Sequence, residues 1–192
     1  MKYNSNALLE NLQADTRQII LQANQLLQLP SAALQQQPVP EKWSVAQVLE
    51  HLNIYSRHYV NAIEQKLHLN QTEPNVSFSP GWLGNYFTNL MKPKADNTIA
   101  KKMKAPKNSI PSTQPDAAKM LQEFIQYQHQ LLNLLQIAKS ANLEHIRIPT
   151  TLSKLISLKL GDTFRFFIAH EQRHFLQIQN TLTANNSQKA VA

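Results

Sequence analysis

The chain has 192 residues, of which 42% are hydrophobic, and this length suffices for one domain with a single substantial core. It contains 3 glycines and long stretches rich in Leu, Gln, Ala and Lys, which favours helices over a sheet with many tight turns. With 0 cysteines, the chain offers no disulfide and no thiolate, so histidines and carboxylates must form any metal or catalytic site. We predict one all-α domain over residues 1–192, with a core at about 6–182 and a polar C-terminal tail.

The net charge of +7 is concentrated in one stretch. Between Lys92 and Lys107 there are six lysines and a single acid, Asp96. Such a stretch can bind phosphate or nucleic acid, but this one has no arginine and no aromatic residue to stack on bases. We interpret it as a solvated loop, and nucleic-acid binding is the function we favour least.

The sequence contains no obvious targeting segment. Its first residues lack the continuous apolar run of a signal peptide, and no run approaches the ~20 apolar residues that cross a bilayer. A soluble, cytoplasmic protein without a membrane partner is the expectation.

Apolar residues recur at helical spacing in two long segments of the first half. The first predicted helix covers about residues 6–29 and is ended by Pro30. Ser44 and Gln47 fit a capping box, in which each side chain bonds the other residue's amide, so a second helix should cover residues 44–69.

Two more long helices are predicted in the second half. Thr113, Pro115 and Asp116 supply start signals for a third helix that fades near residue 140. Asp162 or Thr163 should cap a fourth helix that ends at about residue 182, followed by a frayed tail.

The connections between these helices are long. Residues 70–115 lack a helical pattern, apart from a short apolar piece at 82–91 that fits a small helix or a lid. Residues 141–160 are irregular, with room for a turn or two of helix at 152–160. Four long helices with two extended connections indicate a four-helix bundle, a fold that binds metals through side chains on facing helices.

Three histidines are the candidate metal ligands. His170 and His174 lie four residues apart on one face of the fourth helix, a spacing at which two imidazoles can hold one ion. His51 occupies an inward position on the second helix and would complete a site with an open fourth position, with His58 as reserve ligand. An inward histidine is more often a hydrogen-bonded core residue, however, and spacing alone does not establish His51 as a ligand.

Residues 170–174 also match the HExxH pattern, in which the glutamate acts as general base. A metalloprotease is disfavoured, because no Asp, Glu or His follows His174 to supply a further ligand. Glu171 lies about 100° around the helix from His170. It could therefore act beside the site, as a catalytic residue, or lie on the bundle surface paired with a lysine or arginine.

Two segments resemble the DinB-like (YfiT-like) metalloenzyme superfamily. The first matches the family's signature of Pro, Lys, Trp-Ser and then His-Leu, at Pro40, Lys42, Trp43-Ser44 and His51-Leu52. The second is similar to the family's ending of Leu-Gly-Glu, His-x-x-Arg-His and x-x-Gln, at Leu160-Gly161-Asp162, His170, Arg173-His174 and Gln177. Asp162 replaces the more usual glutamate, and the lysine-rich stretch matches no family motif.

The resemblance implies an up-down-down-up four-helix bundle with a divalent metal on His51, His170 and His174. Zinc or nickel is the expected ion, with iron or manganese as alternatives. Members with known activity are thiol-dependent S-transferases or isomerases that use a low-molecular-weight thiol such as bacillithiol or mycothiol. A bacterial homodimer is the corresponding expectation for the assembly.

These observations lead to two hypotheses. In the first, a metal activates an imported thiol (transferase) or water (hydrolase) for attack on a small electrophile, with Arg173 holding an anionic group of the thiol or forming a surface salt bridge. The substrate pocket would then be formed by Trp43, Tyr55, His58, Phe166 and Phe167. In the second, the protein is a noncatalytic metal- or ligand-binding stress-response bundle.

Overall fold

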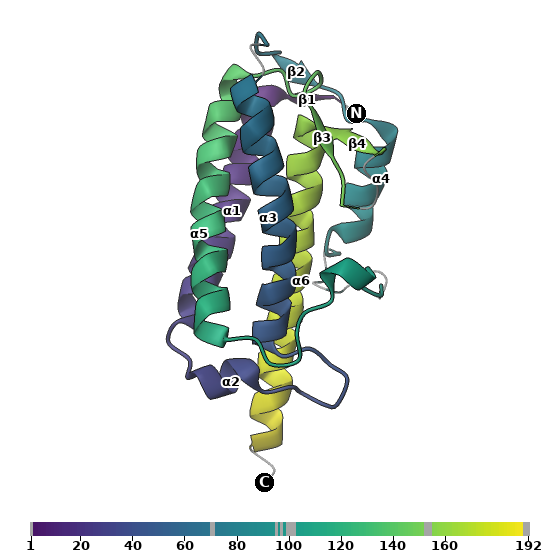
Figure 1. The fold of residues 1–192 in the computed structure, drawn as a ribbon. Helices are drawn as coiled ribbons and strands as arrows, with labels where there is room; N and C mark the ends of the chain where they lie inside the picture. Colours follow the sequence, from purple (N-terminus) through teal and green to yellow (C-terminus); the bar gives the residue numbers. More distant parts are fainter. Residues whose placement is uncertain are drawn as a thin grey trace.

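Four long helices lie side by side in the computed structural model, which describes residues 2–69, 72–94, 96, 98, 103–151 and 155–189 (Figure 1). They are α1 (Ser5–Leu26), α3 (Val45–Leu69), α5 (Ala117–Ile137) and α6 (Leu160–Lys189). The predicted all-α class is confirmed. None of the described helices combines the length and apolarity that crossing a membrane requires.

The helix directions follow from contacts near their ends. The start of α1 lies beside the segment that follows α3, where the Ser5 amide donates to the Val76 carbonyl at 3.0 Å. Near the opposite end, the Gln47 side chain at the start of α3 donates to the Ser112 carbonyl, just before α5, at 3.1 Å. Thus α3 and α5 run in the same direction, and α1 and α6 run in the other (Figure 1).

The two predicted helix starts in the middle of the chain have the expected caps. The Ser44 amide donates to Gln47 Oε1 at 3.0 Å, and the Gln47 amide donates to Ser44 Oγ at 3.3 Å, so the capping box is confirmed. At α5, the Asp116 carboxylate accepts from the Lys119 amide at 3.1 Å. These bonds satisfy amides that the first turn of each helix leaves without a helical partner.

The core lies between the four long helices. Each of them contributes large apolar side chains that are less than 2% exposed, including Leu9, Leu49, Leu52, Ile63, Leu121, Phe124, Leu131, Leu135, Phe164 and Phe167. Burying one such side chain stabilises the fold by roughly 1.5–3 kcal/mol. This rigid core fixes the positions of α3 and α6, which carry the candidate ligands.

Short strands replace one predicted element. β3 (Arg147–Pro149) pairs antiparallel with β4 (Ser157–Lys159), with Ile148 opposite Leu158. A helical turn at residues 157–159 is therefore wrong, while residues 152–154 lie outside the described residues. Leu158 is buried between two more exposed neighbours, and this alternation suits a strand. A second pair joins β1 (Tyr3–Asn4) to β2 (Ser77–Phe78).

The short apolar piece forms α4 (Trp82–Met91), as predicted, and it packs against the start of α6 (Figure 1). All 3 glycines of the chain lie at this corner. A Cβ at Gly84 would overlap the side chain of Asp162, and a Cβ at Gly161 would lie 2.7 Å from Phe78 Cε2. The close approach of α4 to α6 thus depends on the missing side chain of Gly84, and that of Phe78 to α6 on the missing side chain of Gly161.

Helix α1 ends earlier than predicted, at Leu26, whereas helix α6 is longer than predicted at both ends. Helix α6 begins before Asp162, which lies inside the first turn, so the predicted cap is wrong. It also continues to Lys189, because its polar end is not frayed: Asn185 is only 4% exposed and donates to the Gln36 carbonyl at 3.0 Å. Gln36 follows α2 (Ser31–Gln35), a short helix within the first connection.

Candidate metal centre

His51 of α3 and His170 and His174 of α6 come together inside the bundle. Their ligand nitrogens all lie within 4.8 Å of one another. His170 Nε2 is the central atom, 3.4 Å from His51 Nε2 and 3.1 Å from His174 Nε2. The proximity that the sequence predicted is therefore confirmed for all three side chains.

The nitrogen separations fit a common metal ion. Zinc binds imidazole nitrogens at about 2.0–2.1 Å in tetrahedral geometry, which places two ligand nitrogens about 3.3 Å apart. The observed separations of 3.1 and 3.4 Å bracket that value. Three imidazoles in this arrangement leave the fourth tetrahedral position to another ligand.

In two of the histidines, the ring nitrogen Nδ1, which does not form the cluster, contacts an oxygen acceptor. His51 Nδ1 lies 2.7 Å from the Ser109 carbonyl, and His174 Nδ1 lies 2.9 Å from Gln177 Oε1. Both partners accept hydrogen bonds, so they select the tautomer with hydrogen on Nδ1 and leave a lone pair on Nε2. His170 Nδ1 is buried and has no hydrogen-bond partner among the described residues. The two oriented rings thus direct lone pairs toward the same point.

The surroundings keep these rings neutral. Burial lowers the pKa of His51. Burial, together with the charges of His51 and Arg173, lowers the pKa of His174 to about 3. Burial, together with the charges of His174, His51 and Arg173, holds the pKa of His170 well below its usual value. Neutral imidazole is the form that binds metals.

Aromatic rings surround the histidines. Trp43 lies 5.0 Å from the His51 ring, Tyr55 lies 4.4 Å from the His170 ring, and Phe166 lies 6.2 Å from the His170 ring, all between centroids. His51 and His170 are only 2% and 3% exposed. The three nitrogens therefore face an enclosed, largely apolar environment.

The DinB superfamily profile matches residues 9–178 of the chain. The chain belongs to the DinB superfamily. Members of this superfamily are often metal-dependent. Searches of curated proteins and of solved structures give no significant match.

Two predicted pocket residues of this DinB superfamily member have other contacts. Phe167 is fully buried and packs on Tyr59, with ring centroids 5.4 Å apart. His58 Nε2 lies 3.0 Å from the Pro149 carbonyl, and His58 is not part of the histidine cluster. Trp43, Tyr55 and Phe166 thus adjoin the candidate ligands, whereas Phe167 and His58 contact neighbouring parts of the bundle.

Glu171 and Arg173 are both buried, so the surface position considered for each is wrong. Glu171 is 0% exposed and accepts from Gln128 Nε2 of α5 at 2.6 Å. Burial raises the pKa of Glu171 to about 8. Arg173 is 7% exposed, and burial lowers its pKa. Glu171 therefore connects α6 to α5.

The sequence reasoning missed the Ser109 contact to His51. Ser109 ends a short 3-10 helix, Lys107–Ser109, in the connection before α5. It contributes a backbone carbonyl, and a backbone contact leaves no signature in the residue type. The Gln177 contact, by contrast, could be found from sequence, because residues three apart on a helix are neighbours.

Proposed function

We propose that the His51, His170 and His174 cluster binds a divalent metal, and that the protein is a metal-dependent enzyme acting on a small electrophile. The single observation that carries this proposal is the convergence of the three histidine nitrogens within 4.8 Å of one another, with the two separations from His170 Nε2 suited to one ion. Zinc and nickel are the preferred candidates, followed by iron and manganese, since nitrogen ligands suit them all.

The chain's own residues prepare the site in two ways. The Ser109 carbonyl and Gln177 hold two of the rings in the metal-binding tautomer. Trp43, Tyr55 and Phe166 surround the rings with apolar surface that limits the access of bulk water. Three neutral ligands leave the charge of the ion undiminished, and when bound it would supply a Lewis acid that lowers the pKa of a thiol or water.

The preferred nucleophile in this proposal is a low-molecular-weight thiol. The chain has 0 cysteines, so a thiol must enter from solution as a co-substrate. The sulfur would bond to an electrophilic carbon of the substrate, which releases its leaving group, while Arg173 would hold an anionic group of the thiol. Water as nucleophile would make the same site a hydrolase. We place a homodimer in the cytoplasm as the working form.

Metal content tests the first half of the proposal. Protein purified without added chelator should contain about one transition metal per chain by elemental analysis, and His170→Ala should lose it. His129→Ala is the matched control, because His129 is exposed on α5 and lies outside the cluster. Circular dichroism of each variant confirms that the helices are retained. Wild-type protein that remains folded and binds no metal would overturn the proposal.

Activity tests the second half. Metal-loaded protein is assayed for conjugation of a model electrophile with bacillithiol, mycothiol and other small thiols, and separately for ester hydrolysis. We expect one of these rates to exceed that of His51→Ala. If the protein binds metal stoichiometrically and neither rate exceeds that background, the enzymatic proposal fails and a noncatalytic binding bundle replaces it.

A further inference from the structure

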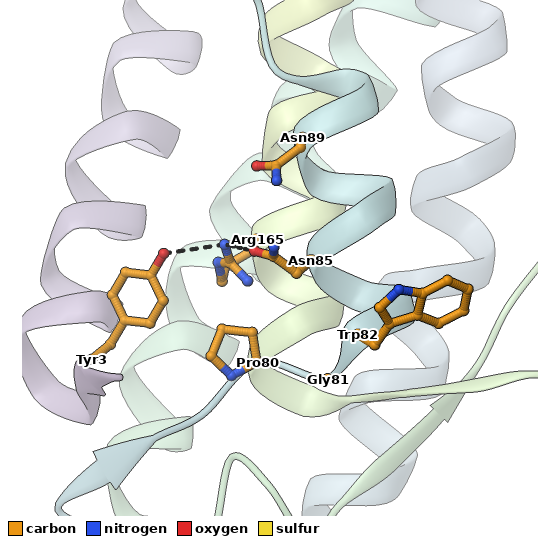
Figure 2. Close-up of a pocket in the computed structure, with 7 residues that line it drawn as sticks. All are labelled: Tyr3, Pro80, Gly81, Trp82, Asn85, Asn89 and Arg165. Carbon is orange, nitrogen blue, oxygen red and sulfur yellow. Dashed lines mark hydrogen bonds between the residues drawn. The ribbon is translucent and has the colours of Figure 1, made fainter. Parts of the chain in front are cut away.

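A second cluster of polar groups lines a cavity between α4 and α6, with a volume of about 260 Å³ (Figure 2). Arg165 of α6 lies at its floor, 8% exposed, between Tyr3 of β1 and Asn85 of α4. Gly81 and the exposed Asn89 form part of its rim. The indole of Trp82 extends away from Arg165 (Figure 2).

This cavity is separate from the histidine cluster. Arg165 precedes His170 by five residues, which places its side chain about 140° around the α6 axis from His170. The Arg165 guanidinium carbon lies 5.0 Å from the Tyr3 ring centroid, at the N-terminal end of the chain. No residue of the cavity lining belongs to the cluster of candidate metal ligands.

The hydrogen bonds of Arg165 determine which polar atoms remain for a ligand. Arg165 Nη2 donates to Tyr3 Oη at 3.2 Å and to Asn85 Oδ1 at 3.1 Å. A guanidinium has only donors, so the Asn85 oxygen must face it and the Asn85 amide nitrogen must face away. Both N–H groups of Nη2 are then used, so Arg165 contributes its positive charge, while the Asn85 amide, beside that of Asn89, offers N–H donors to the cavity.

Both oxygens of Asp162, which contacts Arg165, accept hydrogen bonds. Asp162 Oδ1 accepts from Arg165 Nη1 at 3.2 Å, and Asp162 Oδ2 accepts from the Gly81 amide at 2.7 Å. Asp162 is 1% exposed, and it does not line the cavity. Among the described residues, those that line the cavity include no acid.

We propose that this cavity, which we call the Arg165 pocket, binds the carboxylate of a small organic acid. The positive charge of Arg165 attracts an anion to the cavity, and the Asn85 amide supplies an N–H donor for a carboxylate oxygen. One arginine, partly balanced by Asp162, suits a monoanion better than a phosphate dianion. The volume suits a ligand smaller than a typical drug-sized molecule, whose pockets begin at about 300 Å³.

Selective labelling makes this proposal directly testable. The 3 glycines of the chain all lie at this corner, so the protein labelled with ¹⁵N-glycine gives three amide signals. Gly81 lines the Arg165 pocket, whereas Gly161 packs on Phe78 and serves as an internal reference. The full-length protein is titrated at constant ionic strength with propionate, with its neutral isostere propionamide, and with inorganic phosphate.

We expect propionate to shift the Gly81 signal saturably, and propionamide to produce no saturable shift. Asn85→Asp should weaken propionate binding roughly 10- to 100-fold, because it replaces an amide donor by a negative charge. This variant should still fold, since Asn85 is exposed and the new carboxylate would contact Arg165 near the start of α4. Asn61→Asp, at an exposed position of α3, is the matched control and should bind propionate as the wild type does.

Three results would overturn the proposal. They are equal shifts with propionate and propionamide, unchanged propionate binding in Asn85→Asp, and tighter binding of phosphate than of propionate. None of these readouts depends on the metal or on enzymatic activity, so the Arg165 pocket and the proposed enzyme are tested independently.

Discussion

Helix α6 carries two polar clusters on different faces, and these clusters present groups of opposite polarity to a ligand. In the histidine cluster, the Ser109 carbonyl and Gln177 contact Nδ1 of two rings, so ring lone pairs converge. In the Arg165 pocket, Arg165 donates to the oxygens of Tyr3 and Asn85, so the N–H groups of the Asn85 amide are directed away from Arg165. Converging lone pairs suit a cation, and converging donors suit an anion. The hydrogen-bond partner on one side of a polar group thus decides which kind of ligand the other side of that group can bind.

Asp162→Ala should have the largest effect. It tests whether the stability of the fold depends on the ion pair between Asp162 and Arg165. The change leaves the Arg165 guanidinium buried without its acid and removes the acceptor of the Gly81 amide. We expect a loss of about 3–5 kcal/mol in the free energy of unfolding, measured by urea denaturation.

Asp162→Asn provides the comparison for that experiment, because it keeps the shape and the acceptor oxygen while removing the charge. It should cost less than the alanine variant. If both variants unfold at the wild-type urea concentration, the ion pair does not stabilise this corner.

Gln177→Ala tests whether the hydrogen bond between Gln177 and His174 contributes to metal affinity. Removing the acceptor for His174 Nδ1 should weaken zinc affinity roughly 10- to 100-fold in competition with a chelator, since such partners orient the ligand. Gln177→Glu keeps an acceptor and should bind zinc at least as tightly as the wild type. Gln179→Ala, at an exposed position on the same helix, is the control. An affinity unchanged in Gln177→Ala would show that the His174 ring is held by packing alone.

Glu144→Gln should have the smallest effect. It tests whether the Glu144 carboxyl makes the stability of the fold depend on pH. Burial opposes the charge of Glu144, but the Ser79 amide and Lys159 outweigh burial and lower the pKa of this carboxyl. A lowered pKa contributes stability above the pKa of the unfolded chain, and this stability is lost as the pH falls through the folded value.

The stability difference between wild type and Glu144→Gln should therefore shrink as the pH falls from 6 toward 3, as measured by urea denaturation. Because the side chain is 34% exposed, the difference should stay below about 1 kcal/mol. A difference that grows on acidification would contradict the assignment.

Local signals explain the parts of the fold that could be predicted. The Ser44 and Gln47 capping box and the start of α5 at Asp116 depend on residues within one turn, and both are confirmed. The pairing of His170 with His174 likewise follows from helix geometry. The inward position of His51 follows from the apolar stripe that surrounds it on α3.

The missed features depend on contacts between distant segments. The β4 strand forms because Leu158 lies opposite Ile148, and the end of α6 is held by the Gln36 carbonyl. Glu171 is buried because Gln128, 43 residues earlier, donates to it. A single polar residue gives no indication of such a partner, so burial of these groups could not be predicted from periodicity.

The most direct test of the central claim is a titration of chelator-treated protein with cobalt(II), followed by visible absorption. Cobalt(II) in a tetrahedral site absorbs far more strongly than hydrated cobalt(II). We predict an intense spectrum that saturates at about one equivalent, persists in His129→Ala and is absent in His170→Ala. A wild-type titration that shows only the weak spectrum of hydrated cobalt(II) would contradict a metal site at His51, His170 and His174.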